Sequence, residues 1–566
     1  MPCTEKSAAR AGDTVSPYPF CDKLEYVAGD YKKYCSGKKL EKKHSAFMKL
    51  LEEWAQSDSA CSNKKIKSVY SYVKKGTLGE DLLKSKSVAE ICTPADIETH
   101  NFFIRWEVEI SGDNKPQTWD DSEIQQLWID FYSNHFSNKK GFCYVSGKTE
   151  PIAELHPKKI RTSGDSAKLI SSNDDHNYTF RGRFLDADQA CQVGMAVSVK
   201  AHSALRWLIE KQGVVYYTGE GIKKKPSLTI VAWCSASDVE PQLLKSTNAL
   251  GWDEDDEEKY TPGESSANAI KNRLRGYYGK IPEDDKILIM GLNAATTGRM
   301  SILLYREFIK SDFCEAQENW HEHLAWFYTY WKKDQNVPYH TISAPSPVEI
   351  AKAAYGGHLS DNVKVMTIQR LLPCIIDKSP IPFDIERLCF DRASRLETIS
   401  KNEREKTLET ACAVIRYNLY MRNKEKKEDY KVGLEEDRKN RDYLYGRLLA
   451  VADRVESLVL HGRGETRDTN AVRYMQRFAK YPCSTWEFLY VEKLQPYFSQ
   501  LKNRGQFEAL IQKISGLFDH DEFVSDKALS GEFLLGYHCQ QKAFWESKAK
   551  LKAVKQSKPI NDEKDD

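Results

Sequence analysis

SLTIVAW at residues 227–233 and KILIMGL at residues 286–292 are the two stretches that decide the fold class. Each is a short apolar run with β-branched or large aliphatic side chains, which is typical of a buried strand. Residues 102–110 alternate apolar and charged side chains at their end and predict a further strand. Helical spacing occurs at residues 44–54, 66–73, 119–135 and 193–211. The first part of the chain therefore predicts a mixed α/β region.

The C-terminal part has a different pattern. Residues 443–460 place an apolar side chain on one helical face at every turn, namely Leu444, Leu448, Ala452, Val455 and Val459. Similar stripes recur at residues 408–419, 507–517 and 533–544. Several amphipathic helices in succession are typical of a bundle. We therefore predict an α+β fold, in which a mixed N-terminal α/β region is followed by a C-terminal helical bundle.

These patterns divide the chain into three predicted regions. Residues 1–140 form an N-terminal mixed region, whose polar first 16 residues we expect to be disordered. Residues 141–361 form an α+β region, in which the six consecutive acids at 253–258 predict a mobile loop. Residues 362–566 form the helical bundle, and the charged tail after Lys548 is expected to fray.

Composition restricts the class of protein. The chain of 566 residues carries 84 basic and 82 acidic side chains, and this balance argues against a nonspecific polycationic binder. Fourteen cysteines are present, but none forms a Cys-x-x-Cys pair, so a structural zinc site is not expected. No apolar leader and no run long enough to cross a bilayer are seen, so we expect a cytoplasmic protein.

A basic segment between Cys143 and Gln189 is the strongest candidate site. From His156 to Phe184 it holds six basic and three acidic residues. Cations can hold phosphates, and Arg, Asn or Gln can read base edges. The candidate residues for contact with DNA are Lys158, Lys159, Asn173, Arg181, Arg183 and Gln189. The alternative interpretation is a solvated loop between a strand and a helix.

Two weaker sets of residues accompany this segment. Asn293 and Arg299 flank a predicted turn directly after a buried strand, where they could contact a polyanion, or cap the turn and pair with a local acid. In the helical part, cations cluster and could follow a single strand, although a charged helix face is more often only solvated. The candidates there are Arg422, Lys424, Arg441 and Arg447.

Signals for catalysis are missing from the sequence. It has no phosphate-binding Gly-x-x-x-x-Gly-Lys loop and no Gly-x-Ser-x-Gly elbow. His321 and His323 are two residues apart, so they leave different sides of a helix and cannot chelate a metal together. We therefore predict no catalytic residue, no metal and no cofactor, and keep a DNA-processing nuclease as an alternative.

Taken together, these motifs resemble the large subunit of type I-C CRISPR Cascade, the surveillance complex of prokaryotic adaptive immunity. The resemblance extends over about residues 15–545. It is carried by Cys143, Gly147, His156-Pro157, Asn173, Phe180, Gln189, Ala201-His202, Leu205, Leu208, the run 229–233, residues 292–301, residues 444–451 and residues 535–537. Each motif is short, and their order and spacing together are specific.

The resemblance implies a noncatalytic protein that recognises the protospacer-adjacent motif on double-stranded DNA. It also implies that the protein helps to open the duplex and to recruit a helicase-nuclease. The implied partners are crRNA, the subunit that caps the crRNA 5′ end and the backbone-filament subunits. The helical C-terminal part resembles the small subunit of related complexes. The resemblance implies that this part can also be made separately from an internal start, for which Met421 is a candidate, and that the separate small subunit is then a further partner. A structural RNA-protein scaffold without motif reading is a further alternative.

The sequence departs from the family pattern in two places. Met1 lies where the family already approaches an Arg-x-Gly, Cys-Asp and Tyr stretch, so we expect a late start or a truncated chain. That stretch is matched by Arg10, Gly12, Cys21, Asp22 and Tyr26. Arg181-Gly182-Arg183 also replaces the commoner small-polar turn. The family's preference for one motif sequence is therefore not transferred.

Overall fold

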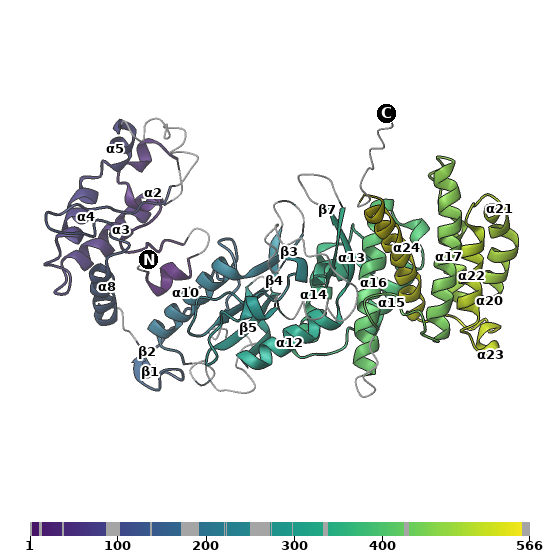
Figure 1. Ribbon diagram of the computed structural model, residues 1–566. Coiled ribbons are helices and arrows are strands. Elements are labelled where there is room, and N and C mark those ends of the chain that lie inside the picture. Colours follow the sequence, from purple (N-terminus) through teal and green to yellow (C-terminus); the bar gives the residue numbers. More distant parts are fainter. Residues whose placement is uncertain are drawn as a thin grey trace, which may run out of the picture. The chain divides into compact units, whose positions relative to one another are not determined.

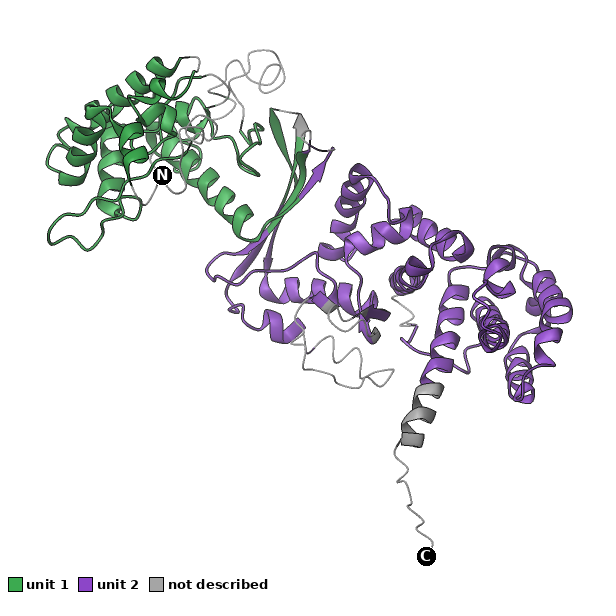
Figure 2. Cartoon of the chain, turned by 90° about the horizontal axis from the view of Figure 1, so that it is seen from above, with its two compact units in different colours: residues 1–215, 225–231, 291–304 green, residues 216–224, 232–290, 305–566 purple. Residues whose placement is uncertain are grey.

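A computed structural model of the chain describes most of its residues (Figure 1). The described residues are 3–10, 14–36, 39–85, 102–135, 139–170, 189, 192–219, 221, 224–249, 272, 274–296, 298–331, 338–423 and 430–556. The chain forms two compact units, coloured separately in Figure 2. Unit 1 comprises residues 1–215, 225–231 and 291–304, and unit 2 comprises residues 216–224, 232–290 and 305–566.

Helices dominate the first part of unit 1. They are α1 (Glu5–Ala8), α2 (Leu24–Val27), α3 (Leu40–Ala55), α4 (Lys64–Lys75), α5 (Leu78–Lys84), α8 (Ser122–His135) and α10 (Met195–Gln212). A small antiparallel hairpin of β1 (Lys140–Phe142) and β2 (Thr149–Pro151) lies between α8 and α10 in the sequence. The predicted helices at 44–54, 66–73, 119–135 and 193–211 are thus confirmed as α3, α4, α8 and α10.

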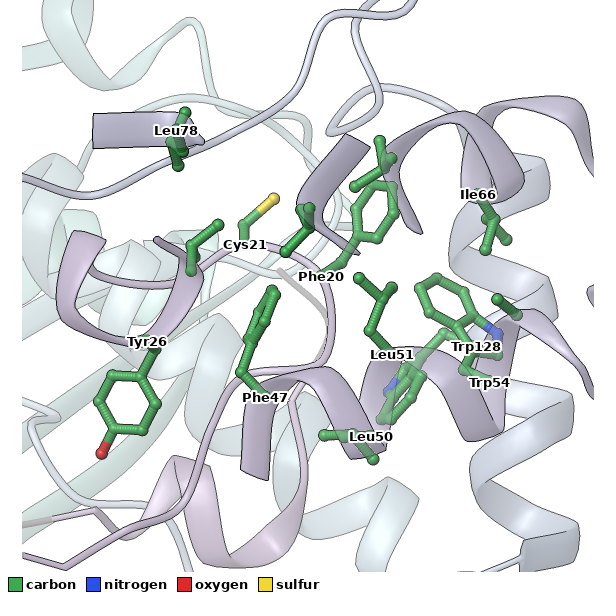
Figure 3. Packing of buried hydrophobic residues seen from close by; sticks show 14 of the residues in the cluster. Phe20, Cys21, Tyr26, Phe47, Leu50, Leu51, Trp54, Ile66, Leu78 and Trp128 are labelled. Atoms are coloured by element: carbon green, nitrogen blue, oxygen red, sulfur yellow. The ribbon is translucent and has the colours of Figure 1, made fainter. Parts of the chain in front are cut away.

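Aromatic side chains fill the core of the first helices (Figure 3). The apolar stripe of α3 is buried along its length, and Phe47 and Trp54 have no exposed surface. The Trp54 ring meets Phe20 edge-on at a centroid distance of 5.4 Å and Trp128 of α8 at 5.2 Å. Edge-to-face packing of this kind adds stability beyond the burial of area.

The start of the chain and residues 102–110 both make local contacts. Thr4 caps α1, and Arg10 forms an ion pair with the buried Asp22, whereas the expected disorder of residues 1–16 remains a prediction. Residues 102–110 do not form a continuous strand. They make isolated bridges, Phe103 with Lys23 and Glu107 with Gln117, and among the described residues no neighbouring strand extends the ladder, so the predicted strand is wrong.

A four-stranded sheet follows α10, in the order β3-β4-β5-β6. Its strands are β3 (Val214–Thr218), β4 (Lys225–Cys234), β5 (Lys286–Thr296) and β6 (Arg299–Ile309). The buried runs at 227–233 and 286–292 lie in β4 and β5, as predicted. The segment 253–258, predicted to be a mobile acidic loop, lies outside the described residues.

In unit 2, α12 (Lys310–His323) follows the sheet, and a further hairpin and then more helices come after it. The hairpin strands are β7 (Trp326–Trp331) and β8 (Pro338–Ser343), which pair antiparallel. The helices are α12 (Lys310–His323), α13 (Pro347–Tyr355), α14 (Asp361–Ile376), α15 (Phe383–Ala393), α16 (Lys401–Arg422), α17 (Arg441–Gly462), α18 (Asn470–Arg473), α19 (Met475–Lys480), α20 (Pro482–Phe488), α21 (Gln495–Phe498), α22 (Arg504–Ser515), α23 (His520–Phe523) and α24 (Glu532–Gln556). The predicted α+β class and helical C-terminal part are confirmed.

Short turns of other helix types connect several of these elements. They are the 3-10 turns η1 (Tyr31–Lys33), η3 (Thr247–Ala249) and η4 (Leu396–Thr398) and the π-turn η6 (Leu489–Leu494). Helix α24 continues past Lys548 to Gln556, so the expected fraying does not begin at Lys548. The predicted region boundaries at 140 and 361 remain predictions. Within the described part of the chain, no helix combines the length and apolar character that a bilayer crossing requires.

Candidate nucleic-acid interface

Unit 1 contains a hollow of about 290 Å³ whose walls are rich in cations. Five basic and two acidic residues line it. The basic residues are Arg10, Lys23, Lys43, Lys158 and Lys159, and the acids are Glu25 and Asp165. The structure thus brings Lys158 and Lys159, predicted from the sequence, together with three cations that the sequence prediction missed. A concentration of positive charge in a concave surface favours an anionic ligand.

A buried ion pair shapes the loop that carries the two lysines. The Arg161 Nε donates to Asp165 Oδ2 at 2.8 Å, and both side chains are almost fully buried. Arg161 Nη1 also donates to the Ser227 carbonyl oxygen on β4 at 2.6 Å. All of this guanidinium is therefore committed inside unit 1. Although Arg161 counts toward the basic character of the sequence, its role is to hold the loop.

The backbone turns sharply at Lys159. This residue adopts φ 61°, in the left-handed region, and its N–H donates to the Asp165 carbonyl oxygen at 3.0 Å. The neighbouring Lys158 carbonyl oxygen accepts from Arg206 Nη2 of α10 at 2.7 Å. A non-glycine residue held in this region costs free energy and persists where the surrounding contacts determine it. The positions of Lys158 and Lys159 are thus fixed by the fold.

The surroundings of Lys159 disfavour the positive charge of its own side chain. Its pKa is lowered by burial and, in addition, by the nearby cations Arg10, Lys23 and Arg206. Among the described residues, neither Lys158 nor Lys159 makes an ion pair, whereas Lys43 pairs with Glu25 at 2.5 Å. A bound anion would relieve the repulsion between these cations.

Arg10 joins the lining of the hollow from a part of the chain distant in sequence. Its guanidinium binds both carboxylate oxygens of Asp22, at 2.8 and 2.9 Å. Its terminal carbon lies 4.8 Å from the Tyr18 ring centroid and 4.6 Å from that of Tyr26. The resemblance singled out Arg10, Asp22 and Tyr26 as one stretch of the family pattern, but it did not predict that Arg10 lies beside Lys158 and Lys159.

His156 connects the loop to α10. Its burial leads us to expect that the stability of the fold depends on pH. Its Nδ1 lies 2.8 Å from the Ser198 hydroxyl, and burial lowers its pKa to about 4. The unfolded chain therefore binds a proton at a higher pH than the folded chain does. Stability that is present above pH about 6.5 should be lost as the pH falls toward 4.

The free energy of unfolding should fall with decreasing pH in this range. In the variant His156→Gln, the slope of this free energy against pH should be shallower by up to the contribution of one proton. Urea unfolding of the full chain at several pH values between 7 and 4 measures it. His135→Gln is the control, since that side chain is about half exposed. Equal slopes for the wild type and His156→Gln would contradict the prediction. Part of the pH dependence remains in every variant, because burial also lowers the pKa of other histidines, including His202 and His321.

The remaining residues of the predicted basic segment are only partly described. Asn173, Arg181 and Arg183 lie outside the described residues. Gln189 is helical and exposed. The prediction that these residues contact DNA therefore remains a prediction.

The secondary pair, Asn293 and Arg299, lies on strands instead of at the two ends of one long turn. Asn293 belongs to β5, where its Oδ1 accepts from the Ser227 hydroxyl at 3.4 Å and from the Ala294 N–H at 2.7 Å. Arg299 begins β6 and forms a parallel bridge with Lys168. The predicted turn is therefore shorter than expected. Arg299 lies beside the end of the loop that carries Lys158 and Lys159.

The candidate cations of unit 2 are largely committed to structure. Arg447 is fully buried, and its Nε donates to Gln540 Oε1 at 3.1 Å. Arg441 donates to the carbonyl oxygens of Glu522, Ser525 and Lys527 at 2.7–2.9 Å. These contacts argue against strand binding by either residue, because their guanidinium groups already hold the bundle together.

The two other candidates of unit 2 differ from this pair. Arg422 is exposed and forms an ion pair with Glu386 at 2.5 Å. Lys424 lies outside the described residues. His321 and His323, which the sequence analysis rejected as joint metal ligands, both make structural contacts. His321 is buried against the Thr247 hydroxyl, and His323 stacks on Tyr420.

Comparison with known families decides which kind of protein carries this cationic hollow. A family model described as CRISPR-associated protein (Cas_Csd1) matches residues 1–545. The chain belongs to this family. Membership of the Cas_Csd1 family makes it a CRISPR-associated Cascade large subunit, a component of a complex with other Cas proteins and crRNA. No curated protein matches the chain.

Proposed function

We propose that this Cas_Csd1 chain is the noncatalytic large subunit of a type I-C Cascade, and that it recognises the protospacer-adjacent motif on double-stranded DNA. In this role it supports duplex opening and recruits the helicase-nuclease in the cytoplasm. Its partners are the subunit that caps the crRNA 5′ end and the backbone filament. The observation that carries the proposal is the cationic hollow around Lys158 and Lys159.

The chemistry of the hollow suits the DNA backbone. Lysines held at fixed positions neutralise phosphates and set the register of the protein on the duplex, but they carry no sequence information. Base reading then falls to Arg, Asn and Gln side chains, for which Asn173, Arg181, Arg183, Gln189 and Arg299 are the candidates. This division suits a guide-directed complex, because guide–target pairing reads the long sequence and the protein reads a short flanking motif.

Removal of the two lysines should weaken DNA binding equally for all sequences. In the assembled complex, Lys158→Ala/Lys159→Ala should lower duplex affinity roughly 10-fold or more at physiological salt. It should also make the slope of log affinity against log salt shallower by about 2, which is one for each lost phosphate contact. Binding of labelled duplexes at several salt concentrations measures both quantities.

Lys49→Ala is the matched control. Lys49 is an exposed lysine of unit 1 on α3, and it does not line the hollow. An unchanged salt slope in the double variant would contradict phosphate contact by Lys158 and Lys159. A changed motif preference at an unchanged slope would instead assign base reading to them.

A further inference from the structure

The β1–β2 hairpin presents apolar side chains to solvent at its tip. Phe142, Tyr144 and Val145 are 53%, 56% and 67% exposed. We propose that this hairpin is a stacking platform for unpaired nucleotides, a surface separate from the cationic hollow. The proposal deepens the proposed function and rests on it only for the biological source of the unpaired strand.

The backbone under these side chains is held rigidly. Cys143 is fully buried between two exposed neighbours, and its Sγ accepts the N–H groups of Ser146 at 3.4 Å and Gly194 at 3.1 Å. The Cys143 N–H donates to the Lys148 carbonyl oxygen, and its own carbonyl oxygen accepts the Gly147 N–H, each at 2.9 Å. Gly147 closes the turn at φ 68°, which favours glycine. The exposed rings are thus presented on a fixed turn.

Lysines flank the exposed rings in the sequence. Residues 139–150 contain Lys139, Lys140 and Lys148 and a single acid, Glu150. The Glu150 carboxylate accepts from the Ser146 hydroxyl at 2.5 Å, so it is partly committed to the turn. All three lysines are exposed. A protein partner that only buried an apolar tip would not require this excess of cations, whereas a nucleic-acid strand complements it.

Proteins that bind single-stranded nucleic acid combine exposed aromatic rings, on which bases stack, with lysines that contact the phosphates. Every base has a π-face, so stacking tolerates all sequences, and each stacked base strengthens binding roughly 5-fold to 150-fold. The Phe142 and Tyr144 ring centroids are 6.2 Å apart, and the ring planes are inclined by 60°. Two tilted rings at this spacing can each receive one base, while the lysines hold the intervening phosphates.

Helix α10 links the platform to the cationic hollow. Its N-cap, Gly194, binds Cys143 of the hairpin, and its Arg206 binds Lys158 of the hollow. Twelve helical steps separate these residues, or about 18 Å along the axis at 1.5 Å per residue. One helix thus sets the distance between the phosphate contacts of the hollow and the stacking platform.

Binding of short homopolymers to the isolated full chain tests the proposal. The probes are fluorescein-labelled dT15 and U15, and affinity is measured by anisotropy. Phe142→Ala/Tyr144→Ala should weaken binding of dT15 about 30-fold or more, whereas Phe142→Tyr/Tyr144→Phe should bind as the wild type does. Tyr481→Ala, which removes an aromatic side chain of equal exposure in unit 2, is the control and should change nothing.

The outcomes separate this proposal from the proposed function. A loss for dT15 with motif-dependent duplex binding intact in the assembled complex supports a platform for displaced DNA. A loss confined to U15 supports a platform for the guide RNA. Unchanged binding of both probes would overturn the proposal, and so would a defect only in assembly with other subunits, which would make the hairpin a protein contact. Wild-type affinity of the conservative variant shows that binding requires an aromatic ring at each position and not the particular side chain.

Discussion

Gly446→Ala should lower the free energy of unfolding of the chain by about 3 kcal/mol, at the upper end of the range for overpacking a close contact. Gly446 of α17 faces Phe533 and Tyr537 of α24, and an added Cβ would overlap the Phe533 carbonyl oxygen and lie 2.7 Å from the Tyr537 nitrogen. Gly536 of α24 meets the Tyr443 carbonyl oxygen in the same way. Because these neighbours are backbone atoms, a rotamer change cannot relieve the overlap, and the helices must move apart.

Gly462→Ala in the same helix is the matched control. No heavy atom lies within 4 Å of the Cβ that this variant adds, so its stability should stay within about 1 kcal/mol of the wild type. Urea unfolding of the full chain, followed by circular dichroism, compares the two variants. Equal midpoints for Gly446→Ala and Gly462→Ala would contradict the close crossing of α17 and α24.

Asp165→Asn should destabilise unit 1 by about 3–5 kcal/mol, because it leaves the buried Arg161 charge without its partner. An amide at position 165 keeps one oxygen that can accept the Ala167 N–H, which Asp165 Oδ1 accepts at 3.0 Å, but it turns an NH2 group toward the donors of the Arg161 guanidinium. The turn at Lys159 then loses its support, and duplex binding should fall along with stability. Urea unfolding and duplex affinity of the same preparation measure the two effects.

Arg161→Met/Asp165→Leu distinguishes an unpaired charge from lost packing. Replacing both members of a buried ion pair with apolar side chains is often nearly neutral. The double variant should therefore recover most of the stability that Asp165→Asn loses. A double variant as unstable as Asp165→Asn would show that the hydrogen bonds to Ser227 and Ala167, and not the charge pairing, hold the loop.

Periodicity in the sequence predicted the helices and central strands well. The stripe of Phe47 and Trp54 in α3 and the stripe that begins at Leu444 in α17 are both buried as expected. These predictions succeed because an amphipathic face has a period that is visible in a short window. Residues 102–110 show the limit of this reasoning, since alternation favours an extended backbone but cannot supply a neighbouring strand.

The candidate interface was predictable only in part. The basic segment pointed to Lys158 and Lys159, yet Arg10, Lys23 and Lys43 join them from more than a hundred residues away. Composition also could not show that Arg161 and Arg447 are buried. A charged residue is counted equally in sequence whether it faces solvent or an internal partner, and only tertiary contacts distinguish the two.

Binding of the assembled complex to duplexes with randomised flanking motifs tests the central claim most directly. The chain is co-expressed with the neighbouring Cascade subunits and a crRNA, and the bound motifs are compared with those bound by a complex that lacks the chain. Strong selection of one motif class, lost without this chain, is the predicted result. Assembly with equal binding of all motifs would contradict motif recognition and leave a structural scaffold.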